Sequence, residues 1–453
     1  MRNKKLIEIK MKNYKIEKLN SGLKIITVPM KGTKTVTLSI IVGTGSKYEN
    51  RKNNGISHFL EHMFFKGTKK RPTAFALSSE LDSMGAEYNA FTTKEYTGYW
   101  IKTESGKIEK AMDILSDMML NLKLDAKEIV REKGVIIEEI NMYQDNPMMQ
   151  IEDVFENCLY GDTPAGWDVI GTKKNIFDFT KKDFTDYLNA QYSIANSFVF
   201  LAGDIEGNKN KIDIFLDKYF SQEIFSKRGK NFQEKKVVVE DQKDPQIKVK
   251  YKKTDQAHLY LGCRAFGYDH KDKLIAKLIS IILGGSMSSR LFINLRERNG
   301  LAYYVRTDTE SYTDSGYLAT RAGVPVDKLD KAIGIMINEY KKIKKELVKK
   351  EELDRVKDLF KGRLAIQLES SDNLTDWYSR QMVLLSTIAR EEGKNNIEKN
   401  IMTPDEYANK IKKITPEDIK RVANKIFVNK NLNLALIGPF TNDKKFKRLI
   451  NLL

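Results

Sequence analysis

The stretch Lys107-Ile-Glu-Lys-Ala-Met-Asp-Ile-Leu115 recurs in the second half of the chain as Lys328-Leu-Asp-Lys-Ala-Ile-Gly-Ile-Met336. In both copies the apolar residues are spaced by three and four positions, which is typical of an amphipathic helix with one buried face. One match of this length can arise by chance. A second match in the same order would indicate that the chain contains two copies of one domain.

The second match lies further along each half and combines a helix start with a strand. Five residues recur at the same spacing: Thr180, Asp183, Asn189, Asn196 and Gly203 correspond to Thr415, Asp418, Asn424, Asn431 and Gly438. In each copy a Thr is placed to cap the start of a helix, and an apolar run that ends in Gly follows. We therefore expect a helix, a turn and a buried strand in both halves.

Together the two matches predict a tandem pair of α+β domains with the same topology. Strand-like runs such as 23–28 and 35–42 open the first half before helices begin, as in domains that combine sheets and helices. Apolar periodicity fades over 226–245, where Lys, Gln, Asp and Pro accumulate. We place the N-terminal domain at 1–228, a linker at 229–245 and the C-terminal domain at 246–453.

The composition is that of a globular protein with an excess of positive charge. The chain has 453 residues, of which 41% are hydrophobic and 31% charged, enough for two domains with substantial cores. The net charge of +17 comes from 78 basic and 61 acidic residues. Because Lys and Glu are interleaved on helical segments such as 341–361, we interpret the excess as solvated helix faces and expect no nucleic-acid partner.

Cysteine content and hydropathy bear on the cellular environment. The two cysteines, Cys158 and Cys263, are too few and too far apart for a disulfide framework or a zinc cluster. They are compatible with a reducing compartment, and we expect a cytoplasmic protein. The basic N-terminus lacks the apolar core of a secretory signal, and no segment offers about 18 consecutive apolar residues, so we expect no membrane span.

The segment Gly55-Ile-Ser-His-Phe-Leu-Glu-His-Met-Phe-Phe-Lys-Gly67 contains two of the four histidines in the chain. On a helix, His58, Glu61 and His62 share one stripe, and the other residues are mostly apolar. Two imidazoles one turn apart can bind one Zn²⁺, and Glu61 can act as general base. The order His-x-x-Glu-His is the inverted zincin motif. The alternative is a pair of satisfied core histidines, but burying these groups on an apolar helix is costly without a cation.

A third zinc ligand is needed, and the acidic segment 131–140 offers Glu132, Glu138 and Glu139. Glu132 and Glu139 lie within about 20° of each other on a helix, whereas Glu138 points about 100° away from Glu139. One face can therefore hold a ligand and a supporting carboxylate. Spacing alone leaves open that all three glutamates are solvated surface groups.

These motifs together resemble those of the pitrilysin family of metallopeptidases, which includes insulin-degrading enzyme and the mitochondrial processing peptidase. The resemblance spans nearly the whole chain and is carried by 55–68, Glu132-x₆-Glu139, Asn89-Ala-Phe-Thr-Thr-Lys-Glu95 and Leu295-Arg-Glu-Arg-Asn-Gly-Leu-Ala-Tyr-Tyr-Val305. It implies that each domain is a mixed, mainly antiparallel sheet packed with helices. It also implies that Glu139 is the third zinc ligand and that Glu132 supports the site.

The resemblance extends to residues that would contact substrate. Asn89, Ala90 and Phe91 resemble the family's edge strand, which pairs with the backbone of an extended peptide; from the residues alone they are equally an ordinary strand start. Arg296 and Tyr303 resemble the family's pair that contacts substrate and stabilises the tetrahedral intermediate. Without the resemblance, the adjacent tyrosine at position 304 is equally eligible.

The second half has no counterpart of the metal motif. The corresponding stretch, Leu274-Ile-Ala-Lys-Leu-Ile-Ser-Ile-Ile-Leu283, carries no ligand, and His258 and His270 stand apart from any zinc pattern, as surface or loop residues would. We therefore expect one Zn²⁺ per chain. Long family members enclose substrate in a chamber made of two such tandem pairs. The resemblance therefore implies a homodimer, or a heterodimer with a related subunit, in which Arg296 and Tyr303 of one subunit complete the zinc site of the other.

The resulting expectation is a zinc-dependent endopeptidase that hydrolyses extended or unfolded polypeptides, in processing or in degradation. The alternative is a non-catalytic structural or partner subunit of the same fold. The presence of every ligand position and of the arginine and tyrosine pair disfavours that alternative.

Overall fold

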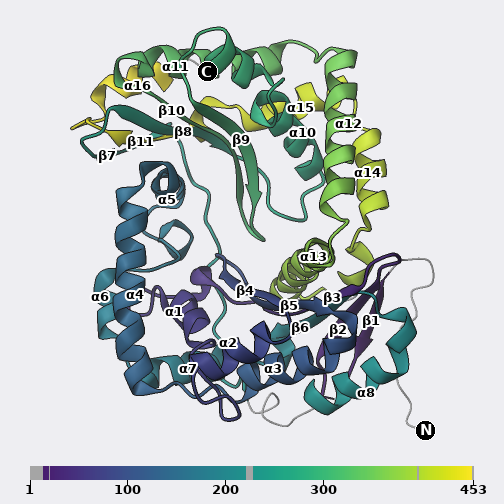
Figure 1. Cartoon of the computed structure of the whole chain (residues 1–453). Coiled ribbons are helices and arrows are strands. Elements are labelled where there is room, and N and C mark those ends of the chain that lie inside the picture. The colour runs from purple at the N-terminus through teal and green to yellow at the C-terminus, as the bar shows by residue number, and fades with distance from the viewer. Residues whose placement is uncertain (1–13, 20, 221–227, 395–396, 451–453) are drawn as a thin grey trace. The chain divides into compact units, whose positions relative to one another are not determined.

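The computed structural model describes residues 14–19, 21–220, 228–394 and 397–450. The described chain forms two compact units, each built around its own sheet (Figure 1). Unit 1 draws on the ranges 1–140, 168–236 and 365–403, and unit 2 on 141–167, 237–364 and 404–453. Each unit therefore takes one segment from the opposite half of the sequence.

A six-stranded sheet forms the centre of unit 1, in the order β1-β2-β6-β3-β5-β4. Its strands are β1 (Lys15–Lys18), β2 (Lys24–Pro29), β3 (Thr35–Val42), β4 (Glu87–Thr92), β5 (Thr97–Glu104) and β6 (Ser197–Gly203). β2 and β6 are parallel, and the other neighbours are antiparallel. The mixed, mainly antiparallel sheet expected for this half is confirmed.

Alternation along β3 separates the two faces of this sheet. Val36, Leu38, Ile40 and Val42 are at most 1% exposed and belong to the hydrophobic core, because successive side chains of a strand point to opposite faces. The helices that contribute to this core are α1 (Ile56–Met63), α2 (Ala74–Asp82), α3 (Ile108–Leu120), α4 (Ala126–Asp145), α6 (Lys173–Asp178), α7 (Lys181–Gln191) and α8 (Lys209–Phe220).

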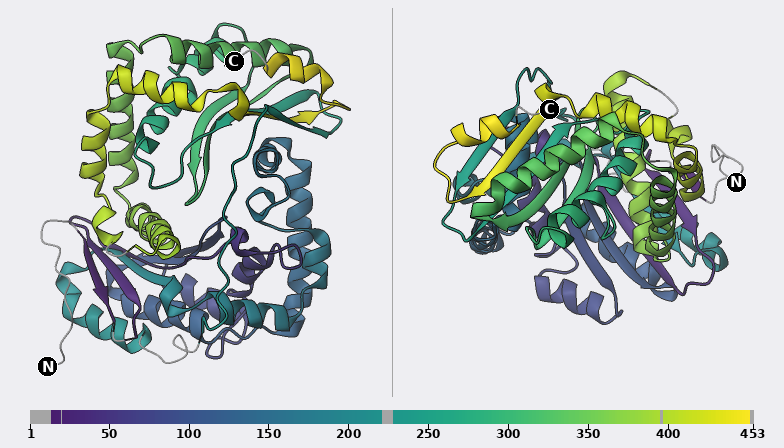
Figure 2. Two further views of the ribbon diagram at one scale, coloured as in Figure 1. Left: turned by 180° about the vertical axis from the view of Figure 1, so that it is seen from behind. Right: turned by 90° about the horizontal axis from the view of Figure 1, so that it is seen from above.

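The opposite face of the unit 1 sheet is more polar and is covered by α13 (Ser371–Glu392), which comes from the second half of the chain (Figures 1 and 2). Thr37 Oγ1 lies 2.8 Å from Ser371 Oγ, and Lys102 Nζ donates a hydrogen bond to Asp372 Oδ1 at 3.0 Å. α13 is therefore held on the sheet by polar contacts.

Unit 2 repeats this plan with a five-stranded sheet in the order β7-β11-β8-β10-β9. Its strands are β7 (Gln246–Tyr251), β8 (Gln256–Arg264), β9 (Tyr304–Ser311), β10 (Gly316–Pro325) and β11 (Leu432–Gly438). Its helices are α5 (Pro147–Tyr160), α10 (Lys273–Gly284), α11 (Leu329–Lys345), α12 (Lys350–Gln367), α14 (Pro404–Lys412), α15 (Pro416–Ile426) and α16 (Lys444–Ile450). The order matches β2-β6-β3-β5-β4, and β7 and β11 are again parallel.

The exchanged helix of unit 2 is α5, from the first half of the chain, which packs on β7, β8 and β11. The rings of Phe155 and Tyr260 have centroids 4.5 Å apart, and Tyr317 donates a hydrogen bond from its hydroxyl to Glu156 Oε1 at 3.3 Å. α5 thus takes the place on this sheet that α13 takes on the sheet of unit 1.

The repeats found in the sequence correspond to equivalent elements. α3 and α11 contain the first repeat, and α7 and α15 begin at the N-caps Thr180 and Thr415, as predicted; the structure adds that each N-cap is part of a capping box. The two compact units do not coincide with the two repeats of the sequence. The reason is that unit 1 includes α13 from the second half of the chain and unit 2 includes α5 from the first half. The boundaries proposed at 228 and 246 describe the duplication and stay a prediction.

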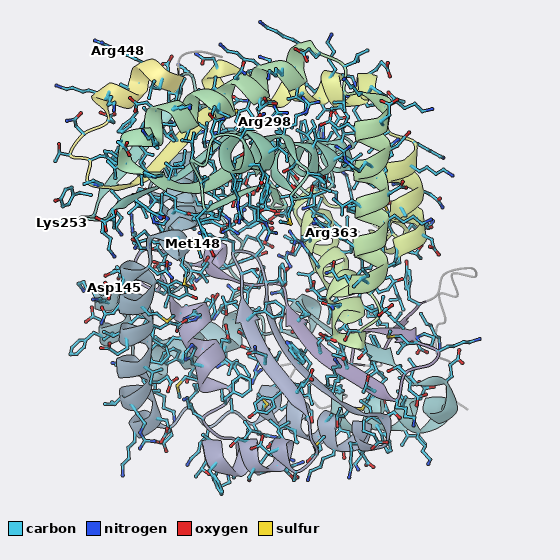
Figure 3. The ribbon with its side chains drawn as sticks, turned by 45° about the horizontal axis from the view of Figure 1, so that its top comes forward. Asp145, Met148, Lys253, Arg298, Arg363 and Arg448 are labelled. Carbon is cyan, nitrogen blue, oxygen red and sulfur yellow. The ribbon has the colours of Figure 1, made fainter. Side chains whose placement is uncertain are left out.

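The surface agrees with the interpretation of the charge excess as solvated side chains. Lys253, Arg298, Arg363 and Arg448, labelled in Figure 3, are exposed on unit 2. Among the described helices, none combines the length and apolarity needed to cross a bilayer.

Candidate metal centre

The helix α1 packs its apolar residues and leaves its polar stripe accessible. Ile56, Phe59, Leu60 and Met63 are at most 1% exposed, so burial of this face fixes the rotation of the helix. The preceding Gly55 has φ 99° and lies so close to Ile170 and Gly171 that a Cβ would meet backbone atoms at 2.7 and 2.9 Å. Glycine is therefore required where the chain turns into α1.

A buried carboxylate that the sequence analysis did not single out holds the start of α1. Glu49, 4% exposed, accepts hydrogen bonds from Gly55 N at 2.8 Å, Ser57 N at 2.9 Å and Asn54 Nδ2 at 3.0 Å. Burial raises the pKa of Glu49, and these hydrogen bonds oppose the rise. A carboxylate at the first free N–H groups of a helix is a favourable placement. The only hint of this role in the sequence is that Glu49 is an acidic residue a few positions before the start of a helix.

Three side chains converge at the accessible stripe of α1. Ligand atoms of His58, His62 and Glu139 all lie within 4.8 Å of one another. Nε2 of His58 is 3.7 Å from Oε1 of Glu139, and Nε2 of His62 is 3.5 Å from Oε2. Within the described ranges this is the one such group of His, Cys, Asp and Glu residues.

The second acidic residue of α4 orients one of the two imidazoles. Nδ1 of His62 lies 2.8 Å from Oε1 of Glu132, which is 2% exposed, and Lys66 Nζ is 2.6 Å from Oε2. Burial alone would raise the pKa of Glu132, but His62 and Lys66 outweigh burial and lower it. The ionised Glu132 leaves Nε2 of His62 facing Glu139. Glu138, by contrast, is exposed.

The donor set fits Zn²⁺. Two imidazole nitrogens and one carboxylate are the protein ligands of many catalytic zinc sites, with a position left for water. Burial, with a smaller effect of the neighbouring His62, lowers the pKa of His58 to about 3. His58 is therefore neutral, as a metal ligand must be.

Glu61 lies beside this group without belonging to it. Thr92, at the end of β4, donates a hydrogen bond from Oγ1 to Glu61 Oε2 at 2.5 Å. Burial raises the pKa of Glu61; Thr92 and His62 oppose the rise, and Glu139 adds to it. A buried carboxylate with a raised pKa is suited to accept and return a proton.

The residues expected to bind substrate backbone lie in β4. Asn89, Ala90 and Phe91 pair with Trp100, Tyr99 and Gly98 of β5. In the described sheet β4 has no neighbour on its other side, and α1 contacts it. The structure therefore places these residues on an edge strand next to α1.

Arg296 and Tyr303 belong to unit 2, whereas the residues of the metal centre belong to unit 1. Arg296 lies in the π-helical turn η6 (Phe292–Glu297), and its guanidinium carbon is 5.7 Å from the ring centroid of Tyr303. Tyr303 is 79% exposed. The hydroxyl of Tyr304, the alternative candidate, is hydrogen-bonded to His258 Nδ1 at 2.9 Å. Tyr304 therefore already has a partner within the sheet.

The expectation for His258 needs correction. It lies inside β8 and is partly buried, rather than in a surface loop. The alternation of the strand around it was not recognised in the sequence. His270 does lie in a loop, where its ring stacks on Phe266 at a centroid distance of 4.1 Å.

Comparison with known families and proteins extends these observations. Residues 24–173 match the family model described as Insulinase (Peptidase family M16), and residues 178–360 match the model described as Peptidase M16 inactive domain. An uncharacterised zinc protease of Bacillus subtilis is 32% identical over 93% of this chain and 97% of its own length. The mouse mitochondrial-processing peptidase subunit beta is 28% identical over 95% of this chain and 86% of its own length.

Solved structures show the same fold. A protease from Helicobacter pylori superposes with a TM-score of 0.83 and 24% identity, over 94% of this chain and 99% of that one. A protein from Pseudomonas fluorescens described as a peptidase M16 inactive domain gives a TM-score of 0.80 at 17% identity, over 95% of this chain and 99% of that one.

Proposed function

Because the chain belongs to the insulinase family of peptidases (M16), the pitrilysin-type family that its motifs resemble, we propose that it is a zinc-dependent endopeptidase for extended or unfolded polypeptides. The observation that carries the proposal is the convergence of His58, His62 and Glu139 within 4.8 Å, with Glu61 adjacent on the same helix. Relatives named zinc proteases support the choice of metal.

In this proposal His58, His62 and Glu139 hold one Zn²⁺ per chain. The ion supplies a Lewis acid that polarises a peptide carbonyl and lowers the pKa of a water molecule. Glu132 fixes the orientation of His62 through Nδ1 and maintains its Nε2 as a metal donor. Such outer partners typically affect metal affinity by about 10- to 100-fold.

Glu61 moves the proton. Its carboxylate takes a proton from the attacking water and returns it to the leaving amine. Thr92 holds Oε2 by a 2.5 Å hydrogen bond, so that the other oxygen is directed to the reaction. The raised pKa of Glu61 favours the first of these transfers, because it makes the carboxylate a stronger base toward the water.

The edge strand β4 is proposed to position the scissile bond. A peptide that adds to Asn89, Ala90 and Phe91 would be bound through its backbone, with little demand on sequence. Because α1 contacts β4 and Thr92 bonds to Glu61, a bound strand would lie next to the catalytic carboxylate. This arrangement favours extended or unfolded substrates over folded proteins.

Arg296 and Tyr303 are proposed to act on substrate within a dimer, either a homodimer or a heterodimer with a related subunit. One relative is named as a subunit, the mitochondrial-processing peptidase subunit beta, which supports an assembly of more than one chain. Mixing Glu61→Gln protein with Arg296→Ala protein is expected to restore part of the activity that each lacks. Subunit exchange without any restored activity would contradict sharing of a site between subunits.

A mixed peptide library tests the proposed function most directly. We expect cleavage that stops when a chelator removes the metal and returns with Zn²⁺, with products read by mass spectrometry. The cleavage positions would also define the sequence preference. A zinc-loaded protein that leaves the whole library intact would contradict the proposal.

A further inference from the structure

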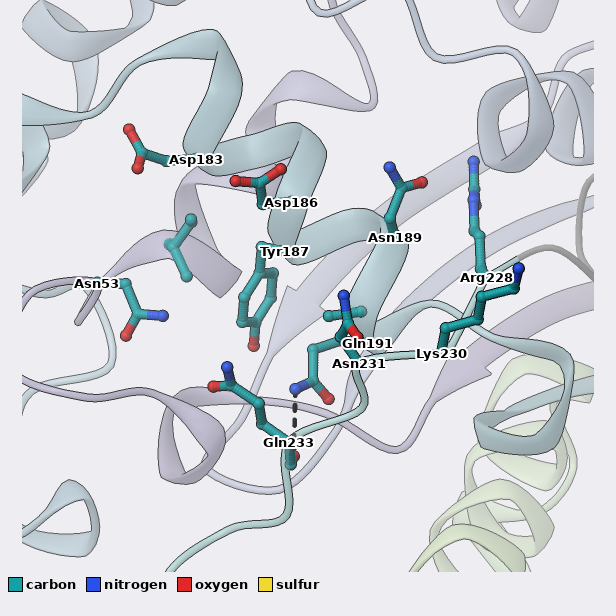
Figure 4. Close-up of a pocket in the computed structure, with 12 residues that line it drawn as sticks. Asn53, Asp183, Asp186, Tyr187, Asn189, Gln191, Arg228, Lys230, Asn231 and Gln233 are labelled. Carbon is teal, nitrogen blue, oxygen red and sulfur yellow. Dashed lines mark hydrogen bonds between the residues drawn. The ribbon is translucent and has the colours of Figure 1, made fainter.

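A cavity of about 790 Å³ runs along α7 in unit 1, and none of the proposed zinc ligands lines it (Figure 4). Its walls come from three segments: the turn before α1, the helix α7 and residues 228–233. The lining is mostly polar and includes the amide side chains of Asn53, Asn189 and Gln233. A polar cavity of this size accommodates a ligand rather than a single water molecule.

One end of this cavity is cationic. Gly229 N donates to Asn189 O at 2.7 Å, which brings Arg228 and Lys230 against the end of α7. Arg228 donates to Met119 O at 3.0 Å, and no carboxylate of the described residues pairs with its guanidinium. Burial lowers the pKa of Arg228 to about 10, so a bound anion would relieve the cost of burying this charge.

The other end is anionic. Asp183 and Asp186 line the cavity from the first two turns of α7, and Figure 4 shows them at the opposite end from Arg228 and Lys230. In the described contacts only Oδ2 of each aspartate has a partner. Asp183 Oδ2 accepts a hydrogen bond from the backbone N–H at the helix cap, and Asp186 Oδ2 lies 2.5 Å from Lys182 Nζ. The remaining oxygens can accept hydrogen bonds from a ligand cation.

A buried acceptor without a partner lies near the cationic end, at the last residue of α7. Gln191, 1% exposed, donates from Nε2 to Gln233 O at 3.1 Å. Its Oε1 is buried and has no hydrogen-bond partner among the described residues. Such an acceptor has lost its hydrogen bonds to water without replacement, and a ligand N–H group would supply the missing bond.

The length of the cavity indicates the size of the ligand. The helix rises about 1.5 Å per residue, so Asp183 and Gln191 are separated by about 12 Å along α7. An extended peptide covers about 3.3–3.6 Å per residue, and about four residues therefore span the same distance.

We propose that this cavity is a second peptide site, which binds a short peptide of about four residues by its free termini. The ammonium group lies at Asp183 and Asp186, the carboxylate at Arg228 and Lys230, and a backbone N–H meets Gln191 Oε1. The choice of peptide rests on the proposed function, because peptides with free termini are the products of an endopeptidase.

The cavity adjoins the start of the helix α1. Tyr187 lines the cavity, and its hydroxyl lies 2.7 Å from Ser57 Oγ and 3.0 Å from Thr44 Oγ1. Ser57 is the neighbour of His58 in α1. The floor of the peptide site is therefore in direct contact with the start of the helix that carries the zinc ligands.

Calorimetric titration of the full-length Glu61→Gln protein with tetra-alanine tests the proposal without requiring turnover. We expect binding that is weakened about tenfold or more by Asp186→Asn and by Lys230→Ala, since each removes a charge-assisted hydrogen bond. Both side chains are exposed, so the substitutions should not impair folding. Acetylated and amidated tetra-alanine is expected to bind at least tenfold more weakly as well.

Matched controls are available in the same unit. Asp178→Asn removes the same kind of exposed helical pair, with Lys174, but outside the cavity, and Lys236→Ala removes an exposed lysine nearby. Both should leave tetra-alanine binding unchanged. The proposal is overturned if the capped peptide binds as tightly, if Asp186→Asn and Lys230→Ala bind like the controls, or if inorganic phosphate binds as tightly as tetra-alanine. None of these outcomes depends on peptidase activity.

Discussion

The helices α1 and α10 occupy equivalent positions in the two units, after β3 and after β8, but only α1 carries a polar stripe. In α10 every residue except Lys273 and Lys277 is buried. In α1, the other residues are apolar apart from the buried Ser57, and His58, Glu61 and His62 form the polar stripe. The comparison teaches that the fold requires only an apolar helix at this position. The polar stripe of α1 is therefore not required by the fold, which agrees with its proposed role in metal binding and catalysis.

The two helices are also anchored differently at their starts. Glu49 binds backbone N–H groups of α1, whereas Asp272, 2% exposed at the start of α10, binds Lys425 at 2.7 Å and Arg421 at 3.0 Å from α15. One carboxylate satisfies the helix itself, and the other joins it to a neighbouring helix. The helix α1 is thus fixed through its own backbone.

The substitution with the greatest predicted loss of activity is Glu61→Gln, which tests whether the polar stripe of α1 is catalytic. Glu61→Gln should reduce peptide hydrolysis by about 10²- to 10⁴-fold, the usual contribution of a general base, while zinc content is retained. Ser280→Ala removes a buried hydroxyl of α10 that bonds only to its own helix at Lys277 O, and it should leave both unchanged. Hydrolysis at the wild-type rate by zinc-loaded Glu61→Gln protein would contradict the proposed role.

The next test separates two adjacent glutamates of α4. Glu139→Gln should lower zinc affinity by about 100-fold or more, beyond the usual range for an outer partner, because Glu139 faces both imidazoles. Glu138→Gln should retain the metal, since Glu138 is exposed. Chelator competition measures both. Zinc kept by the first variant and lost by the second would reverse the assignment.

A smaller effect is expected where α1 begins. Glu49→Ala leaves Gly55 N, Ser57 N and the Asn54 amide without their acceptor, which should lower the free energy of unfolding by about 2 kcal/mol. Glu49→Gln keeps one acceptor oxygen and should cost less. Urea denaturation gives both values, and wild-type midpoints for the two variants would show that Glu49 does not anchor the helix.

The smallest effect concerns the start of α10 and depends on pH. Burial alone would raise the pKa of Asp272, but Lys425 and Arg421 outweigh burial and hold it below the usual 3.8. Its ionised form therefore stabilises the fold above that pH, and the contribution is lost as the pH falls through the lowered pKa.

Asp272→Asn should accordingly cost about 1 kcal/mol at pH 7, a modest value because both partners are partly exposed. The difference from the wild type should shrink as the pH falls below about 4. Urea denaturation at several pH values measures it, and a difference that stays constant down to about pH 2 would contradict the ion-pair explanation.

The sequence alone was sufficient for features that depend on local spacing. Strand β3 was predicted at its observed bounds, Thr180 and Thr415 were predicted as helix N-caps, and the common stripe of His58, Glu61 and His62 follows from the helical period. Such features can be predicted from residues close together in the sequence, because a helix or strand presents its residues to one face at a fixed period.

Contacts between residues far apart in the sequence were known only from the tertiary structure. Only packing brings Glu139 to the imidazoles, Glu132 to Nδ1 of His62 and Thr92 to Glu61, and only packing exchanges α5 and α13 between the units. Glu49 and the cavity along α7 depend on contacts with no period to reveal them. Local spacing was therefore enough to predict the polar stripe of α1 and the duplication. The groups that surround the stripe became known only from the structure, because long-range contacts arise from burial of whole faces rather than from local spacing.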